Sequence, residues 1–173
     1  MKKADFELIT NVLNAAGVPF IVVGGIAVVE HGYGRSTYDL DIVFRLRDDL
    51  VIQAFSALAQ IDYTPRAPIT AEQFADPDLR RQLLEQKRME VLNFWSDTHR
   101  ETPLDIFVTE PFDFHAEYEK AEIRELAPGL PVRIVCLETL LQMKKSAGRP
   151  QDLADIDELS LLHGLPSSYD RPE

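Results

Sequence analysis

Three aspartates interrupt apolar segments of this sequence, where a carboxylate is expensive unless it has a partner. Asp39 and Asp41 lie one residue apart in "YDLDIVFR", and Asp105 stands alone in "PLDIFV". Alternate side chains of a strand point to the same face, so Asp39 and Asp41 converge. An isolated carboxylate inside an apolar strand costs free energy, which makes Asp105 a candidate partner of this pair. We expect the three carboxylates to share one pocket.

Carboxylates gathered in this way suit Mg²⁺, a hard cation that keeps several waters and shares carboxylates with substrate phosphates. Two such ions about 4 Å apart would stabilise both the attacking and the leaving oxygen of an in-line phosphoryl displacement. We therefore expect two Mg²⁺ ions, with Mn²⁺ as the alternative, on Asp39, Asp41 and Asp105.

Glycines and short polar residues precede the aspartate pair. Without side chains, Gly24 and Gly25 allow backbone N–H groups at a helix start to approach a phosphate closely, although a tight turn would need the same residues. Arg35, Ser36 and Thr37 come just before the carboxylates and could contact phosphates or ribose. Arg35 could equally be a solvated loop residue.

A lysine near the C-terminus lies on an apolar helical stripe. In "LETLLQMKKSA" the helical period places Lys144 in the middle of the stripe formed by the leucines and Ala147. A buried lysine needs an anion, whereas Lys145 points toward the edge of the stripe. Asp152 and Asp155 follow, and Asp152 stands near a helix start, where a carboxylate is favoured in any case.

Helices and strands alternate around these residues. The predicted helices are 4–16, 26–31, 48–60, a polar region from Pro68 to about Arg88, 112–121, 137–147 and 151–163. The predicted strands are 19–25, 38–45, 89–95, 103–108, 123–126 and 132–135, with 89–95 and 103–108 forming an antiparallel hairpin. This mixture indicates an α/β or α+β fold with a largely buried mixed sheet. We expect a single domain over 1–173, with an N-terminal helix in 1–17, a sheet core in 18–135 and C-terminal helices in 136–173.

Composition limits the partners. The net charge is −11, from 18 Lys+Arg against 29 Asp+Glu, which argues against a broad basic surface for DNA or RNA. Positive charge for a phosphate must therefore be local, from metal ions, from 143–149, or from 79–88, which is otherwise typical of a solvated helix face. No run of about 18 apolar residues and no signal peptide occur, so we expect a soluble, cytoplasmic protein without membrane contacts. The single Cys136 reads as a small buried apolar residue and leaves no disulfide or zinc cluster.

The order of these motifs resembles the DNA polymerase β-like nucleotidyltransferases over residues 18–160. The resemblance rests on Val23-Gly24-Gly25, on Asp39-Leu40-Asp41-Ile42 and on Leu104-Asp105-Ile106. It implies a nucleotidyltransferase fold, with a nucleotide triphosphate over the glycine turn and two divalent ions on the aspartates. In such a site Asp105 is a metal ligand or the base that activates the acceptor hydroxyl.

The segment "MKKSAGRPQDLADIDEL" is similar to the C-terminal part of abortive-infection (AbiEii-like) toxin-type nucleotidyltransferases. By that resemblance Lys144 contacts the nucleotide phosphates and Asp152 or Asp155 completes the site. The expected reaction moves an NMP from an NTP to a hydroxyl, releasing pyrophosphate. The acceptor could be tRNA in a toxin–antitoxin or phage-defence setting, with an antitoxin protein as partner. A small molecule, as for aminoglycoside or lincosamide adenylyltransferases, is the alternative, and a non-catalytic nucleotide-binding or antitoxin-like module is a third.

Overall fold

The computed structural model describes residues 1–166, and its centre is a mixed seven-stranded sheet with the strand order β3-β4-β5-β2-β1-β7-β6. The strands are β1 Phe20–Val22, β2 Leu40–Phe44, β3 Thr64–Pro65, β4 Val91–Trp95, β5 Leu104–Phe107, β6 Glu122–Ala127 and β7 Leu130–Ile134. β2 pairs with β5, and β1 with β7, in parallel, whereas the other neighbours are antiparallel. The predicted mixed sheet and the antiparallel β4–β5 hairpin are confirmed.

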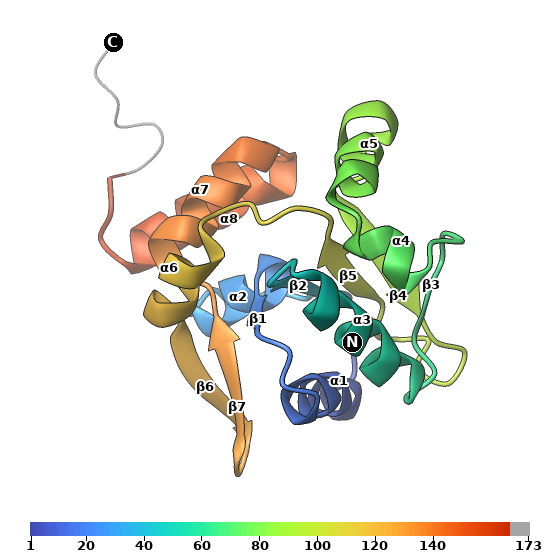
Figure 1. Ribbon diagram of the computed structural model, residues 1–173. Helices are drawn as coiled ribbons and strands as arrows, with labels where there is room; N and C mark the ends of the chain where they lie inside the picture. Colours follow the sequence, from blue (N-terminus) through green and yellow to red (C-terminus); the bar gives the residue numbers. More distant parts are fainter. Residues whose placement is uncertain (167–173) are drawn as a thin grey trace.

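Eight helices of the described residues surround this sheet (Figure 1). They are α1 Lys3–Ala15, α2 Gly24–Glu30, α3 Asp48–Ala59, α4 Ala71–Ala75, α5 Pro77–Lys87, α6 Phe114–Lys120, α7 Leu137–Ala147 and α8 Pro150–Leu162. Residues 167–173 of the predicted C-terminal segment lie outside the described part of the chain. None of the helices in 1–166 has both the length and the apolar character needed to cross a bilayer.

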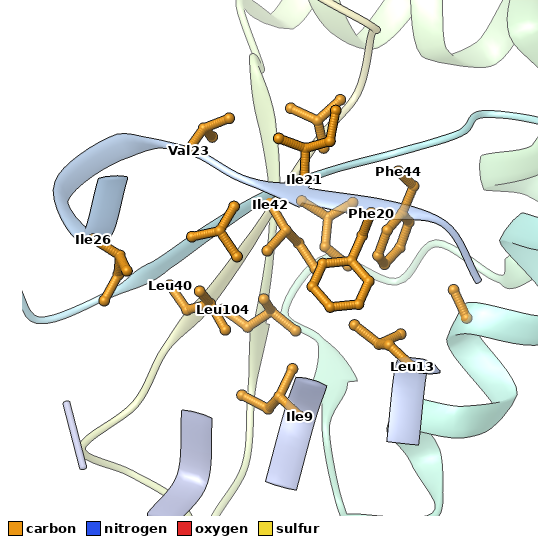
Figure 2. Packing of buried hydrophobic residues seen from close by; sticks show 14 of the residues in the cluster. Ile9, Leu13, Phe20, Ile21, Val23, Ile26, Leu40, Ile42, Phe44 and Leu104 are labelled. Carbon is orange, nitrogen blue, oxygen red and sulfur yellow. The ribbon is translucent and has the colours of Figure 1, made fainter. Parts of the chain in front are cut away.

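Apolar side chains of β2 and β5 pack on the sheet face opposite the aspartates. Leu40, Ile42 and Leu104 are fully buried there, and Ile9 and Leu13 of α1 pack close to them (Figure 2). Strand alternation therefore separates an apolar face from a face that carries Asp41 and Asp105. The apolar packing fixes the register of the strands, because a shift by one residue would bury the carboxylates.

Several predicted boundaries shift at the residues that matter for the site. β1 ends at Val22 and α2 begins at Gly24, so the two glycines belong to the helix rather than to strand 19–25. β2 begins at Leu40, which leaves Asp39 immediately before the strand. The short edge strand β3 was not predicted, because a strand of two residues shows no alternation of apolar and polar side chains. Its Pro65 is compatible with a strand at the edge of a sheet.

The polar region before Arg88 contains two helices rather than one. Asp76 separates them, and its side chain accepts a hydrogen bond from the backbone of Asp78 at the start of α5. Arg80 of α5 is buried and donates hydrogen bonds of 2.6 Å to the carbonyls of Phe74 and Ala75 at the end of α4. The interpretation of 79–88 as a solvated face is therefore wrong for Arg80, because the end of α4 needs its donors.

Cys136 is half-buried in a polar setting, not a small apolar core residue as predicted. Its Sγ lies 3.4 Å from the Glu117 carboxylate and 3.3 Å from Thr139 Oγ1. Its backbone N–H donates to the same glutamate over 2.8 Å, so Glu117 of α6 caps the start of α7.

Candidate active site

Three carboxylates converge at the centre of the sheet, as the sequence predicts. Asp41 of β2 and Asp105 of β5 are register partners on the parallel pair, and Asp39 immediately precedes β2. One oxygen from each of these side chains lies within 4.8 Å of the others. The parallel β2–β5 pairing brings together residues that are far apart in the sequence, so the predicted convergence is confirmed.

Burial and mutual repulsion make the carboxylates costly to ionise. Burial, with the charges of Asp39 and Asp105, raises the pKa of Asp41 to about 7, although a hydrogen bond from the Gly25 backbone and the charge of Arg149 oppose this rise. Burial also raises the pKa of Asp105, and the charge of Asp39 adds to the rise. The charges of Arg149 near Asp41 and of Arg66 near Asp105 favour the ionised forms, but burial outweighs them.

Asn93 of β4 is a site residue that the sequence prediction missed. It is the register partner of Asp105, and its Nδ2 donates a short hydrogen bond to Asp105 Oδ1. This bond lowers the pKa of Asp105, against the larger effect of burial. The alternation of "VLNFW" places a lone amide on one strand face, but its role becomes visible only when β4 is aligned with β5.

The glycine pair packs directly against the site. Gly24 has φ +62°, and a Cβ there would lie 2.0 Å from Asp41 Oδ2. A Cβ on Gly25 would lie 2.4 Å from Thr37 Oγ1. The structure therefore explains both glycines by close packing against Asp41 and Thr37. Contact of their N–H groups with a phosphate stays a prediction.

The loop before β2 connects the site to the C-terminal helices. The Arg35 side chain is only 20% exposed, and its Nε and Nη2 lie 2.8 and 2.9 Å from the two oxygens of Asp155 in α8. The alternative of a solvated Arg35 is therefore wrong. Thr37 Oγ1 lies 3.4 Å from Asp39 Oδ1, whereas Ser36 is exposed.

Lys144 is buried, as its position on the apolar helical stripe predicts, and its ammonium group pairs with two aspartates. Its Nζ lies 2.6 Å from Asp155 Oδ2 and 3.1 Å from Asp152 Oδ1. Arg149 Nε binds the other oxygen of Asp152 at 2.6 Å. Burial raises the pKa of both aspartates. Hydrogen bonds from Arg149 and Lys144 to Asp152, and from Lys144 and Arg35 to Asp155, outweigh burial, so both pKa values lie below the usual range. Lys145 is exposed, as predicted.

A cleft of about 670 Å³ opens over the carboxylates, large enough for a nucleotide-sized ligand. The predicted site residues that line it are Gly24, Gly25, Arg35, Asp39, Asp41, Asp105, Lys144 and Asp152. Ser36, Thr37 and Asp155 are not among the lining residues, and Asp155 is fully buried behind Lys144. Side chains of α7 form much of the opposite wall, which includes Thr139, Met143 and Ala147.

The donor set fits a hard divalent cation. All three groups are carboxylates, and their oxygens are close enough to share ions. Four-coordinate zinc would instead call for histidine or cysteine, and no histidine or cysteine of residues 1–166 joins this cluster.

The sheet order and the closing helices α7 and α8 form a nucleotidyltransferase-like fold, with the three carboxylates at its centre. Comparison with solved structures shows similarity to the antibiotic-resistance factor ANT(2'')-Ia, with a TM-score of 0.57 and 12% identity over 94% of this chain and 86% of that chain. JHP933 from Helicobacter pylori matches with a TM-score of 0.50 and 16% identity, covering 91% of this chain and 64% of that one.

An antigenic nucleotidyltransferase-like protein from Paracoccidioides brasiliensis gives a TM-score of 0.49 with 15% identity, over 92% of this chain and 75% of that one. No protein-family model matches the sequence. No curated protein matches it either. At these identities the similarity concerns the fold alone.

Proposed function

We propose that this protein is a divalent-metal-dependent nucleotidyltransferase, which moves an NMP from an NTP to an acceptor hydroxyl and releases pyrophosphate. The observation that carries the proposal is the convergence of Asp39, Asp41 and Asp105 at the floor of a nucleotide-sized cleft. The nucleotidyltransferase-like fold supports it independently.

In this proposal Asp39 and Asp41 hold the metal ions, and Asp105 is either a further ligand or the base for the acceptor hydroxyl. The bound ions would supply the positive charge that the reacting phosphate oxygens and the carboxylates need. Asn93 fixes the Asp105 carboxylate by its hydrogen bond, so one oxygen of Asp105 remains directed to the pocket.

Three cations at the cleft are available for the triphosphate: Arg35, Lys144 and Arg149. Each is ion-paired with Asp152 or Asp155, which holds it in place before a nucleotide arrives. Positive charges fixed in this way stabilise charge that builds on the leaving pyrophosphate. Asp155 is buried and contacts Arg35 and Lys144, so we assign it a positioning role rather than a contact with the nucleotide.

A non-catalytic binding module would have no use for this arrangement. It would keep Asp41 and Asp105, which burial and repulsion make expensive to ionise, and a fixed amide on Asp105, without a reaction that needs them. The carboxylate site therefore favours an enzyme over an antitoxin-like or nucleotide-binding module.

Two acceptor classes compete within the enzyme proposal. The AbiEii-like resemblance of 143–159 favours tRNA in a toxin–antitoxin or phage-defence setting. The net charge of −11 favours a small molecule, and the structural neighbour ANT(2'')-Ia is named as an antibiotic-resistance factor. That likeness concerns the fold, so the acceptor has to be identified by experiment.

The experiment is incubation of the protein with each α-labelled NTP, Mg²⁺ or Mn²⁺, and either total tRNA or a panel of aminoglycosides and lincosamides. We expect metal-dependent label on one acceptor, and no label with Asp41→Asn. Asp78→Asn, an exposed aspartate of α5, is the matched control and should transfer normally. Transfer at the normal rate by the Asp41 variant would remove the assignment.

A further inference from the structure

A second cavity lies at the loop that joins β4 to β5. Its volume is about 280 Å³, and its lining includes Arg66, Trp95, Ser96, His99 and Pro103. We call this cavity the hairpin pocket. It shares no lining residue with the cleft over the aspartates. The β4–β5 loop and the helices α7 and α8, which wall the cleft, lie on opposite sides of the molecule in Figure 1. The hairpin pocket is therefore a separate cavity.

Arg66 brings to this pocket a positive charge that is not paired with a carboxylate. Its guanidinium carbon lies 5.5 Å from the centre of the Trp95 ring, and none of the ion pairs within residues 1–166 includes it. Arg100, by contrast, pairs with Asp97 at 2.6 Å. A guanidinium over an aromatic ring uses its planar face for that contact. The N–H groups at its edge remain available for two parallel hydrogen bonds to an oxyanion.

His99 offers a second polar atom to the pocket from a fixed position. Its Nδ1 lies 2.8 Å from the carboxylate of the buried Asp5, so this nitrogen carries a proton and donates the hydrogen bond. Thr102 donates to the other oxygen of Asp5 over 2.8 Å, and the Tyr63 ring stacks on the imidazole at 5.7 Å. Nε2 makes no hydrogen bond within residues 1–166 and is not sealed from solvent, so it is open on a side chain that lines the pocket.

Together the two groups favour a phosphate over a carboxylate. Two phosphate oxygens can pair with the edge of Arg66 while a third reaches His99, whereas a carboxylate has only two oxygens. Nε2 can accept the proton of a P–OH group when the ring is neutral, or donate to a P–O⁻ oxygen when the ring is protonated. A phosphate group therefore suits both forms of the imidazole.

The rest of the lining favours a small molecule with an apolar part. Trp95 is 37% exposed and, with Pro103, gives the pocket apolar surface beside the charged groups. Ser96 is buried and holds the loop in shape, because its Oγ accepts hydrogen bonds of 3.2 Å from the backbone N–H groups of Thr98 and His99. The volume is close to the lower limit of about 300 Å³ for ligand sites in proteins.

We propose that the hairpin pocket binds the phosphate group of a small phosphorylated molecule. Arg66 pairs with two of the phosphate oxygens, His99 Nε2 bonds the third, and Trp95 contacts the rest of the ligand. The binding needs neither a metal ion nor the three aspartates. It is therefore independent of the proposed nucleotidyltransferase function.

The only tryptophan of the chain makes this pocket directly observable. Phenyl phosphate, inorganic phosphate and benzoate are titrated into the protein in EDTA and followed by tryptophan fluorescence and by calorimetry. We expect phenyl phosphate to bind and to change the emission of Trp95. Benzoate should bind at least about tenfold more weakly, because it forms one charge-assisted hydrogen bond fewer. Weaker binding of inorganic phosphate would assign a phosphate ester as the ligand, and equal binding would assign free phosphate.

Substitutions test the two groups that bind the phosphate. Arg66→Ala should weaken the binding of phenyl phosphate at least about tenfold, and Arg66→Lys should restore only part of it, since lysine keeps the charge without the paired donors. Arg81→Ala, an exposed arginine of α5, is the matched control and should bind as the wild type does. His99→Gln should also weaken binding about tenfold. Arg66 is exposed, so its variants decide the question even if the His99 variant does not fold.

Several results would overturn the proposal. One is the absence of binding by every phosphate ligand, and another is equal affinity of the wild type and Arg66→Ala. Heat of binding without a change in Trp95 emission would place the phosphate elsewhere, at the cations of the cleft. Benzoate that binds as tightly as phenyl phosphate would replace the phosphate by a carboxylate. Each of these results leaves the nucleotidyltransferase proposal in place.

Discussion

Protonation of Asp41 makes the stability of the folded protein depend on pH. Its pKa is about 7 in the folded protein and 3.8 in the unfolded chain, so the folded state binds more protons between these values. The stabilisation by protonated Asp41 is therefore complete below about pH 4 and is lost as the pH rises through 7. The upper limit of this change is about 4 kcal/mol.

We predict that Asp41→Asn makes the metal-free protein more stable at pH 8 and removes this part of the pH dependence. Asparagine resembles the protonated acid and does not repel Asp39 or Asp105. Thermal melts from pH 4 to 8 in EDTA measure the effect, and Mg²⁺ should then raise the Tm of the wild type but not of the variant. Asp78→Asn should keep the wild-type profile, and an Asp41 variant that is less stable than wild type at pH 8 would contradict the prediction.

For Lys144, the helical period predicts burial but does not predict the partners of the side chain. These partners, Asp152 and Asp155, lie on the next helix, α8, and the spacing of residues in α7 gives no information about them. Removing its ammonium leaves Asp152 and Asp155 with less compensation in a buried setting. We predict that Lys144→Met destabilises the fold by about 3 kcal/mol or more.

Lys145→Met changes an exposed neighbour of the same type and is the matched control, with an expected effect within about 0.5 kcal/mol. Urea unfolding of the two variants gives both numbers. Equal losses would mean that Lys144 extends to solvent and that its aspartate contacts contribute nothing measurable.

At the scale of elements, strand alternation predicted the shared face of Asp39 and Asp41, and the lone Asp105 was placed correctly on a second strand. The parallel pairing of β2 with β5 was not predictable, because the strands are separated by α3, β3, α4, α5 and β4. Asn93 was missed for the same reason, since its role appears only when β4 is aligned with β5. Local patterns define faces, and long-range pairing decides which faces meet.

The start of α2 gives a prediction about the fit between elements. Gly24 and Gly17 both have left-handed backbones, with φ of +62° and +67°, so an alanine costs each about 1–2 kcal/mol of strain. Only at Gly24 would the new Cβ meet Asp41, whereas nothing lies within 4 Å of a Cβ at Gly17. We predict that Gly24→Ala loses more stability than Gly17→Ala and also loses the Mg²⁺-induced rise in Tm. The result would be contradicted if both variants kept that rise.

At the scale of the whole molecule, the site lies between two parts of the chain, the central sheet and the C-terminal helices. The sheet supplies the carboxylates, and α7 and α8 supply a wall whose cations are joined to the loop before β2 through Arg35 and Asp155. The sequence indicated both parts, since the aspartates and Lys144 were identified separately. An ion pair between Arg35 and the buried Asp155 joins them, and because its members are 120 residues apart, no local sequence pattern predicts it.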